Sequence, residues 1–267
     1  MAVSSNNHKL AAIRGFLLDM DGTVFLSDQL LPGAKTFLDL TSRTDTPVLL
    51  LTNNSSNNRE AYVHKIAAMG LQLSPEQILT SGEATAQYMQ THAKDARIAL
   101  FGTPELEQDF LRYDLVLEMQ NPDYVVLGFD TTIDYNKLTL LCDLVRQGLP
   151  YIATHPDFNC PIMGGFIPDI GAIMALVEAS TGRSADIIIG KPSRQILDLA
   201  ASRLGMAIES LCMVGDRLYT DIAMGKEAPI QTALVLSGET KAKDVPNSPF
   251  KPDHIFQNLG ELAEALI

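Results

Sequence analysis

The sequence predicts an α/β protein, with a doubly wound parallel sheet into which a second, smaller α/β domain is inserted. Two observations predict the sheet. Short apolar runs alternate along the chain with stretches of helical spacing, and the runs are almost continuous in their hydrophobicity, as in strands buried on both faces of a parallel sheet. A third observation predicts the insertion, because the same alternation recurs by itself within residues 82–186.

The expected strands are bounded runs rich in Leu, Ile and Val. In chain order they are 15–20, 47–54, 96–102, 123–129, 149–155, 186–191, 210–216 and 232–238. The expected helices are 32–43, 58–70, 103–112, 135–148, 169–182, 193–205 and 220–230. Pro32, Gly70 and Gly205 lie near the ends of these stretches, where Pro and Gly commonly start or stop a helix.

Charge separates the two predicted domains. Residues 82–186 contain 6 Lys and Arg against 15 Asp and Glu, a net charge of −9, whereas the rest of the chain has 14 against 17, a net charge of −3. We therefore expect a core domain made of residues 1–81 and 187–267, and an acidic inserted domain at 82–186.

Composition excludes several classes of function. The net charge of −12 over 267 residues disfavours nucleic acid polymers and anionic membrane surfaces as partners. Three widely spaced cysteines, Cys142, Cys160 and Cys212, predict reduced thiols rather than disulfides or a metal site. The first 15 residues have no apolar signal core. We expect a soluble cytoplasmic protein.

Four of the expected core strands end in polar residues. These are Asp19-Met20-Asp21-Gly22-Thr23, Thr52-Asn53-Asn54, Lys191, and Gly215-Asp216 with Asp221. Taken singly, each could be a turn, a helix cap or a solvated lysine. Ligands of open α/β sheets bind beyond the carboxyl ends of the strands, so the four together predict one polar edge.

This combination of side chains predicts a phosphoryl-transfer site. Asp19, Asp216 and Asp221 would repel one another in a shared site unless a hard divalent cation neutralised them. Ligands that are all oxygen, without His or Cys, suit Mg²⁺ better than Zn²⁺. Phosphate oxygens could then accept hydrogen bonds from Thr52 and Asn53, and Lys191 would offset the repulsion between Asp19 and a phosphoryl group.

These four segments resemble the four motifs of the haloacid dehalogenase (HAD) superfamily. An apolar run followed by Asp-x-Asp-Gly-Thr is similar to the first motif, and GDRLYTDI, GKPS and LLTNNSS resemble subclass IIA, the NagD-like and p-nitrophenyl phosphatase-like branch. The resemblance covers about residues 14 to 240. It implies a Rossmann-like HAD core with an inserted α/β cap domain of the C2 type.

The resemblance also implies an activity, which is Mg²⁺-dependent hydrolysis of small phosphate monoesters through an aspartyl-phosphate intermediate. Asp19 would be the nucleophile and Asp21 the general acid and base, which requires a raised pKa of Asp21. Mg²⁺ would be held by Asp19, the backbone carbonyl of Asp21, Asp216, and Asp221 directly or through water. The implied phosphate-binding residues are Gly22, Thr52, Asn53 and Lys191.

The segment 153–173 resembles the substrate loop of this family, with His155 in place of the usual Asn. His155, Asp157, Phe158 and Asn159 could face the leaving group; alternatively, His155 and Asp157 cap the turn after the preceding strand. An acidic cap should disfavour highly charged leaving groups, so we expect monoesters of sugars, polyols, vitamins or nucleosides as substrates.

Two other functions use the same residues. A phosphotransferase or phosphomutase differs only in the group that accepts the phosphoryl group, and a regulatory binding protein would have lost at least one of the residues Asp19, Asp21, Lys191 or Asp216. All four are present. The expected partners are a small phosphorylated metabolite and, through the cap, a second copy of the chain.

Overall fold

The structure, a computed structural model, describes residues 10–267. The N-terminal residues 1–9, on which part of the expectation about a signal segment rests, lie outside the described residues. The chain forms two compact units: unit 1 contains the residues up to 51, 63–78 and 191–267, and unit 2 contains 52–62 and 79–190. The division into a core and a cap with the boundaries predicted above stays a prediction.

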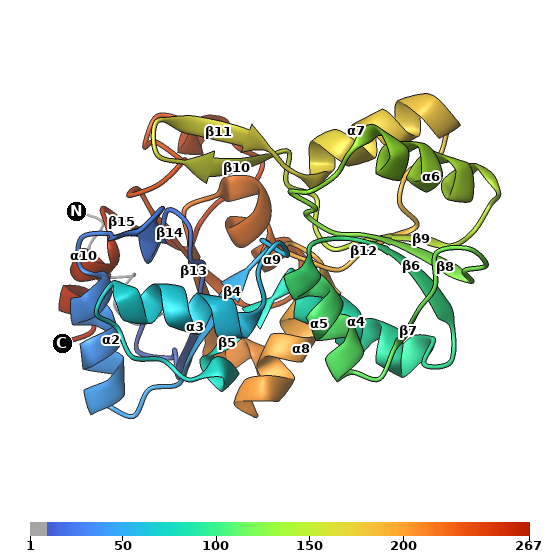
Figure 1. The fold of residues 1–267 in the computed structure, drawn as a ribbon. Coiled ribbons are helices and arrows are strands. Elements are labelled where there is room, and N and C mark those ends of the chain that lie inside the picture. Colours follow the sequence, from blue (N-terminus) through green and yellow to red (C-terminus); the bar gives the residue numbers. More distant parts are fainter. Residues whose placement is uncertain (1–9) are drawn as a thin grey trace. The chain divides into compact units, whose positions relative to one another are not determined.

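Unit 1 is built on a six-stranded sheet with the order β15-β14-β13-β1-β4-β5 (Figure 1). The strands are β1 (Gly15–Leu18), β4 (Val48–Thr52), β5 (Ile78–Thr80), β13 (Leu211–Gly215), β14 (Gln231–Val235) and β15 (His254–Phe256). The pairings of β1 with β4 and β13, and of β14 with β13 and β15, are parallel. The central strands β1, β4 and β13 are buried throughout, which explains their continuous apolar sequences.

The helices around this sheet are α2 (Ala34–Arg43), α3 (Arg59–Ala68), α8 (Arg194–Leu204), α9 (Met224–Glu227) and α10 (Leu259–Ala265), with 3₁₀ turns at Pro75–Gln77, Ile208–Ser210 and Val245–Asn247. Of these, α2, α3 and α8 follow predicted segments closely, whereas α10 was not predicted. Helix α2 packs on the sheet through Phe37, whose ring meets that of Phe16 edge-on with 5.1 Å between centroids. Helix α10 packs against α2, and a short hairpin, β2 (Phe25–Leu26) with β3 (Gln29–Leu30), follows β1.

The helix predicted at 220–230 is wrong in its detail. The structure has a π-helical turn at Leu218–Ile222, followed by the short helix α9. Within this wide turn the Asp221 side chain folds back toward the backbone, where its Oδ2 accepts a hydrogen bond from the Arg217 N–H at 3.0 Å. Such turns occur frequently at functional sites.

Unit 2 has its own five-stranded sheet, with the order β12-β9-β8-β6-β7 and four parallel pairings. The strands are β6 (Arg97–Phe101), β7 (Val116–Leu117), β8 (Tyr124–Leu127), β9 (Tyr151–Ala153) and β12 (Ile187–Ile188). The prediction that residues 186–191 belong to the first sheet is wrong, because Ile187 and Ile188 pair with β9. An apolar run indicates a strand but carries no information about which sheet it joins.

Helices cover both faces of the second sheet (Figure 1). They are α4 (Ser81–His92), α5 (Pro104–Arg112), α6 (Tyr135–Arg146) and α7 (Ile170–Thr181). Residues of α6 and α7 form one buried cluster with residues of β6, β8 and β9, in which Phe101, Leu127 and Tyr151 are the larger members. Helices α4 and α5 pack together on the other face.

The predicted substrate loop contains a β-hairpin. Strand β10 (Asn159–Ile162) pairs antiparallel with β11 (Gly165–Pro168). Gly164 turns the chain between them with φ +82°, a conformation that favours glycine. The sequence predicts a loop in this segment and not a hairpin. No helix within residues 10–267 is long and apolar enough to cross a membrane.

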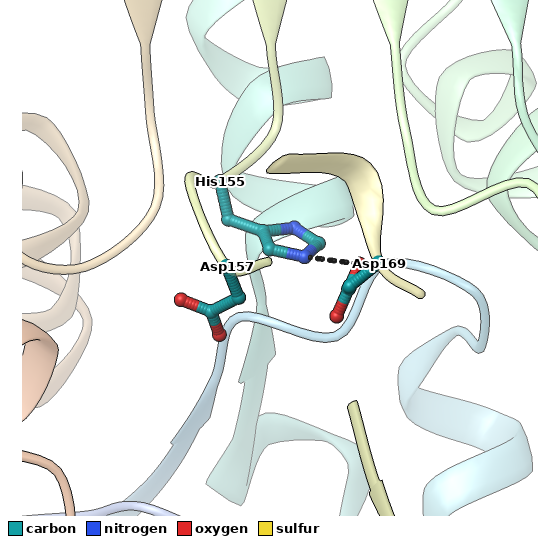
Figure 2. Close-up of side chains that lie close together, drawn as sticks. All are labelled: His155, Asp157 and Asp169. Carbon is teal, nitrogen blue, oxygen red and sulfur yellow. Dashed lines mark hydrogen bonds and ion pairs between the residues drawn. The ribbon is translucent and has the colours of Figure 1, made fainter. Parts of the chain in front are cut away.

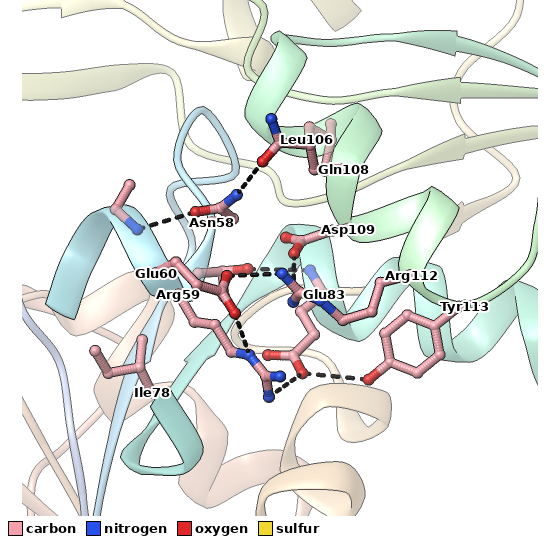
Figure 3. A network of polar contacts seen from close by, with 12 residues as sticks. Asn58, Arg59, Glu60, Ile78, Glu83, Leu106, Gln108, Asp109, Arg112 and Tyr113 are labelled. Atoms are coloured by element: carbon pink, nitrogen blue, oxygen red, sulfur yellow. Dashed lines mark hydrogen bonds and ion pairs between the residues drawn. The ribbon is translucent and has the colours of Figure 1, made fainter. Parts of the chain in front are cut away.

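Figure 3 shows a network of acidic and basic side chains within unit 2. Arg112 bridges Glu60 at 2.7 Å and Asp109 at 3.0 Å, and Arg59 lies 3.4 Å from Glu83. Asp109 is fully buried, and its Oδ2 has no hydrogen-bond partner among the described residues. Burial raises the pKa of Asp109 from 3.8 to about 7; Arg112 opposes this effect, and Glu83 and Glu60 add to it.

This raised pKa predicts that stability falls with rising pH. Between about pH 4 and pH 7 the folded chain keeps a proton on Asp109 that the unfolded chain has lost. The stability that this proton contributes is therefore complete below the unfolded pKa and disappears as the pH rises through about 7. From pH 5 to pH 8 the wild type should lose about 2–3 kcal/mol more than Asp109→Asn, as measured by denaturant unfolding.

Asp123→Asn is the matched control for this experiment. Asp123 is an acid of the same unit, but hydrogen bonds from Arg97 lower the pKa of its exposed carboxyl group. Its titration lies below the range tested, so the variant should keep the wild-type pH dependence. An equal pH slope for the wild type and Asp109→Asn would contradict the prediction.

Candidate functional site

Strands β1 and β13 bring two of the predicted carboxylates to one edge of the sheet of unit 1. The strands are parallel neighbours with Leu18 opposite Val214, and the pairing continues for one more residue because the Asp19 N–H donates to the Val214 carbonyl at 2.8 Å. Asp19 and Asp216 thus leave the sheet from adjacent strand ends. The structure therefore brings these two segments of the expected polar edge together, and the roles of their residues stay predictions.

Three buried carboxylates meet at this edge. Single oxygen atoms of Asp19, Asp216 and Asp221 all lie within 4.8 Å of one another. Burial, and then the charges of Asp19 and Asp221, raise the pKa of Asp216 well above its ordinary value. Burial also raises the pKa of Asp221 to about 6, although Lys191 opposes the shift. The negative charges of the three carboxylates are therefore only partly offset by nearby positive groups.

Lys191 is the cation of the cluster. Its side chain is only 2% exposed, and its Nζ donates to Asp19 Oδ1 at 2.6 Å and to Asp221 Oδ1 at 2.7 Å. Burial by itself would lower the pKa of Lys191, but Asp19 and Asp221 outweigh burial and raise it. Lys191 is thus a permanent positive charge, in contact with two of the three carboxylates.

The remaining donor set fits a hard divalent cation. One ammonium against three carboxylates leaves a formal charge of −2, and all the groups that could bind a metal here are oxygen atoms. Asp216 Oδ1 is buried and has no hydrogen-bond partner in the described part of the chain. An orphaned carboxylate oxygen next to two other carboxylates is costly unless a cation binds there.

Asp21 lies next to this cluster in a different environment. Removal of its carboxyl group from water raises the pKa of Asp21 to about 6; Lys65 opposes the shift, and Asp19 adds to it. The Lys65 ammonium also lies 4.5 Å from the centre of the Phe25 ring. Asp21 can therefore take up and release a proton near neutral pH, as the sequence-based expectation requires.

Gly22 has a steric reason to be glycine. Its φ is +91°, and a Cβ atom on it would lie 2.4 Å from Asp216 Oδ2. The backbone at Gly22 thus lies directly against the Asp216 carboxylate, and no side chain fits between them. The phosphate-binding role expected for Gly22 stays a prediction.

Sequence reasoning missed one segment of this edge, the loop after β14. Ser237 Oγ donates to the Gly22 carbonyl at 2.9 Å, and the Glu239 N–H donates to Asp216 Oδ2 at 2.5 Å. The signal was present in the sequence, since the expected strand 232–238 ends at the same edge of the parallel sheet as the recognised motifs.

The other predicted residues belong to unit 2, where Thr52, Asn53, His155 and Asp157 are buried. Asn53 Nδ2 donates to Asp157 Oδ1 at 3.2 Å. His155 is fully buried, and its Nε2 lies 2.9 Å from Asp169 Oδ1 (Figure 2). Thr52 is also buried, and its Oγ1 accepts from the Asn54 N–H at 3.1 Å.

The predicted substrate residues differ in their accessibility. His155 and Asp157 are buried, whereas Phe158 is 61% exposed and Asn159 begins the exposed hairpin. The alternative that His155 caps a turn needs refinement, because its partner Asp169 is the N-cap residue of α7 and accepts from the Ile170 N–H at 2.6 Å. Since both ring nitrogens of His155 have hydrogen-bonding neighbours, we do not assign this cluster as a metal site.

Family comparisons agree with this geometry. Residues 16–116 match a family model described as haloacid dehalogenase-like hydrolase, and residues 188–262 match one described as HAD-hydrolase-like. The chain is similar to the acid sugar phosphatase of Staphylococcus haemolyticus, with 34% identity over 92% of this chain and 94% of the relative. It is also 32% identical to the dihydroxyacetone phosphatase of Corynebacterium glutamicum, over 93% and 90% of the two chains.

Solved structures of the same kind superimpose on this one. The 4-nitrophenylphosphatase of Thermotoga maritima has a TM-score of 0.94 and 47% sequence identity, over 97% of this chain and all of the other. NagD from Escherichia coli K-12 has a TM-score of 0.86 and 29% identity, over 93% and 98%. The α/β fold class predicted from the sequence is confirmed.

The buried ion pairs of Lys191 generate a prediction about stability. Lys191→Met leaves two buried carboxylates without their cation, and breaking a buried pair in this way typically costs about 3–5 kcal/mol. We expect a lower free energy of unfolding in denaturant titrations. Adding Asp221→Asn to this variant should restore part of the lost free energy of unfolding, because it removes one of the two carboxylates left without a cation. If the losses of the two single variants simply added in the double variant, Lys191 and Asp221 would not interact, which would contradict the prediction.

Proposed function

Because the chain belongs to the haloacid dehalogenase-like hydrolases, we propose that it is a Mg²⁺-dependent phosphatase that hydrolyses small phosphate monoesters through an aspartyl phosphate on Asp19. The observation that carries the proposal is the buried cluster of Asp19, Asp216 and Asp221 with Lys191 held against two of them. The named relatives are phosphatases, which favours hydrolysis over transfer to another hydroxyl group. The four residues whose loss would indicate a binding protein are intact.

In the first step, a carboxylate oxygen of Asp19 attacks phosphorus as the ester P–O bond breaks. Lys191 orients this carboxylate through Oδ1, and Thr23 Oγ1 lies 3.3 Å from its Oδ2. Asp21 donates its proton to the leaving oxygen, a role that its pKa of about 6 supports. The products are a free alcohol and phosphate bound covalently to Asp19.

In the second step, water attacks the phosphorus atom of the aspartyl phosphate. Asp21, now ionised, takes the proton of this water, and the bond between phosphorus and the Asp19 oxygen breaks to release inorganic phosphate. Lys191 offsets the negative charge near the reacting group in both steps. The groups proposed to bind phosphate oxygens are Gly22, Thr52, Asn53 and Lys191.

Mg²⁺ would be held by Asp19, the Asp21 carbonyl, Asp216 and Asp221. When bound, it supplies charge neutralisation for the carboxylates and the phosphate oxygens. The fit of the site rests on its oxygen-only donors and on the orphaned Asp216 Oδ1.

Unit 2 is proposed to act as the cap that selects the leaving group, through His155, Asp157, Phe158 and Asn159. The substrate class is sugar or triose monophosphates, in keeping with the names of the relatives. A cytoplasmic location is part of the proposal because Cys142, Cys160 and Cys212, all within the described residues, are not joined in disulfides, as is usual in reducing compartments.

A homodimer formed through unit 2 is also part of the proposal. The β10–β11 hairpin and the residue before it expose four large apolar side chains, and such a surface is favourable for association. They are Phe158, Ile162, Met163 and Phe166.

Replacing the nucleophile tests the mechanism. Asp19→Asn should lower kcat for p-nitrophenyl phosphate by about 10³-fold or more, since no covalent intermediate can form, and activity of the wild type should disappear when Mg²⁺ is chelated. Circular dichroism would establish that the variant is folded. Mg²⁺-independent turnover, or a variant of near-normal activity, would overturn the proposal, and beryllofluoride bound to Asp19 of the wild type would support the covalent step.

A substrate panel tests the role of the acidic unit. Residues 82–186 carry a net charge of −9, which should repel leaving groups that are themselves highly charged. We expect kcat/KM for sugar and triose monophosphates to exceed that for nucleoside triphosphates and sugar bisphosphates by about tenfold or more, with the difference shrinking as salt screens the charges. A preference for polyphosphates would exclude this explanation of specificity.

A further inference from the structure

The loop of residues 236–240, which follows β14, surrounds the carboxylate of Asp216. The Glu239 N–H donates to Asp216 Oδ2 at 2.5 Å, and the Thr240 N–H donates to the Asp216 backbone carbonyl at 3.2 Å. A Cβ atom on Gly238 would lie 1.9 Å from Asp216 Oδ2. The loop backbone thus contacts both the side chain and the main chain of Asp216.

The Glu239 side chain ties this loop to the segment that carries Asp216. Its Oε2 lies 3.1 Å from Arg217 Nε and accepts from the Tyr219 hydroxyl at 3.3 Å. Arg217 directly follows Asp216 in the chain and is buried. Glu239 is therefore held at both ends, since its backbone N–H contacts the Asp216 carboxylate and its side chain contacts Arg217 and Tyr219, which follow Asp216 in the same segment.

The two oxygens of the Asp216 carboxylate have different contacts. Oδ2 accepts the Glu239 N–H, whereas Oδ1 is buried and has no hydrogen-bond partner in the part of the chain described by the structure. With Oδ2 held by the loop, the carboxylate cannot rotate freely, and one of its oxygens lies within 4.8 Å of an oxygen of Asp19 and of an oxygen of Asp221. Holding a metal ligand in place before the ion arrives lowers the entropy lost on binding.

We propose that Glu239 is a positioning residue for the cation site. It locks the 236–240 loop through Arg217 and Tyr219, so that the loop backbone holds Asp216 in the orientation that binds Mg²⁺. This proposal rests on the proposed function, because it assumes that Asp216 binds Mg²⁺. It adds a residue of the loop after β14 to the four strand-end segments.

The experiment measures Mg²⁺ binding to chelator-treated protein by isothermal titration calorimetry. Glu239→Ala should raise the Kd for Mg²⁺ about tenfold, at the lower end of the range typical for residues that orient metal ligands. The Mg²⁺ concentration for half-maximal turnover should rise by the same factor. The KM for p-nitrophenyl phosphate and kcat at saturating Mg²⁺ should change by less than about threefold, a split that general destabilisation would not produce.

Glu227→Ala is the matched control. Glu227 is an exposed acid of the same unit, so its removal changes the net charge equally and should leave the Kd for Mg²⁺ within about twofold of the wild type. Gly238→Ala gives a second test, because its methyl group displaces the loop from Asp216 and leaves Glu239 unchanged. We expect a loss of Mg²⁺ affinity at least as large as in Glu239→Ala, with thermal unfolding used to establish that the protein is folded.

The outcomes separate the two proposals. Wild-type protein that neither binds Mg²⁺ nor hydrolyses p-nitrophenyl phosphate would overturn the proposed function and, with it, the role of Glu239. If the wild type is active, and Glu239→Ala and Gly238→Ala bind Mg²⁺ with the same Kd as the wild type, the role of the loop would be overturned while the proposed function would stand. Weaker binding in Glu239→Ala but not in Glu227→Ala would support it.

Discussion

The contact on which unit 1 depends is that of the buried Lys191 ammonium with Asp19 and Asp221. Isolated, any of these charges would be too costly to bury. The arrangement requires that β1 and β13 be adjacent and parallel, so that their ends deliver two acidic segments to one place. It also requires Lys191 to lie beside Asp19, although the two residues are far apart in the sequence. Most of unit 2 lies between them in the sequence, outside the six-stranded sheet of unit 1.

Glycine positions make this concentration of carboxylates sterically possible. A Cβ atom on Gly22 or Gly238 would overlap Asp216, and one on Gly215 would lie 2.2 Å from the Asp221 carboxyl group. Each glycine therefore permits the backbone to pass directly against an acidic side chain. The charges of the cluster and its glycines act as one constraint, since a larger residue at any of the three positions would push the carboxylates apart and so weaken the proposed cation site.

The sequence predicted the cluster well because its residues follow continuous apolar strands, which identify the strand ends. It predicted the membership of strands less well: β12 joins the second sheet, and nothing in an apolar run specifies its partner. The β10–β11 hairpin was missed because its strands are short and largely exposed. The contribution of Glu239 could not be foreseen, since it acts first through a backbone N–H, which every non-proline residue carries.

Buried carboxylates elsewhere in the described chain have different neighbours from those of Asp216. Asp130 is paired with the Lys137 ammonium at 2.7 Å, and Asp157 accepts from Asn53. Asp109 has a single guanidinium nearby, and the pKa of about 7 that burial gives it lets the group stay protonated. Asp216 shares with Asp109 an oxygen that has no hydrogen-bond partner within the described chain, but only Asp216 forms a cluster with Asp19 and Asp221 that could hold a metal ion. Protonation would satisfy that oxygen only by removing the negative charge of Asp216, whereas the proposed divalent cation would offset the charges of Asp216 and its two neighbouring carboxylates together.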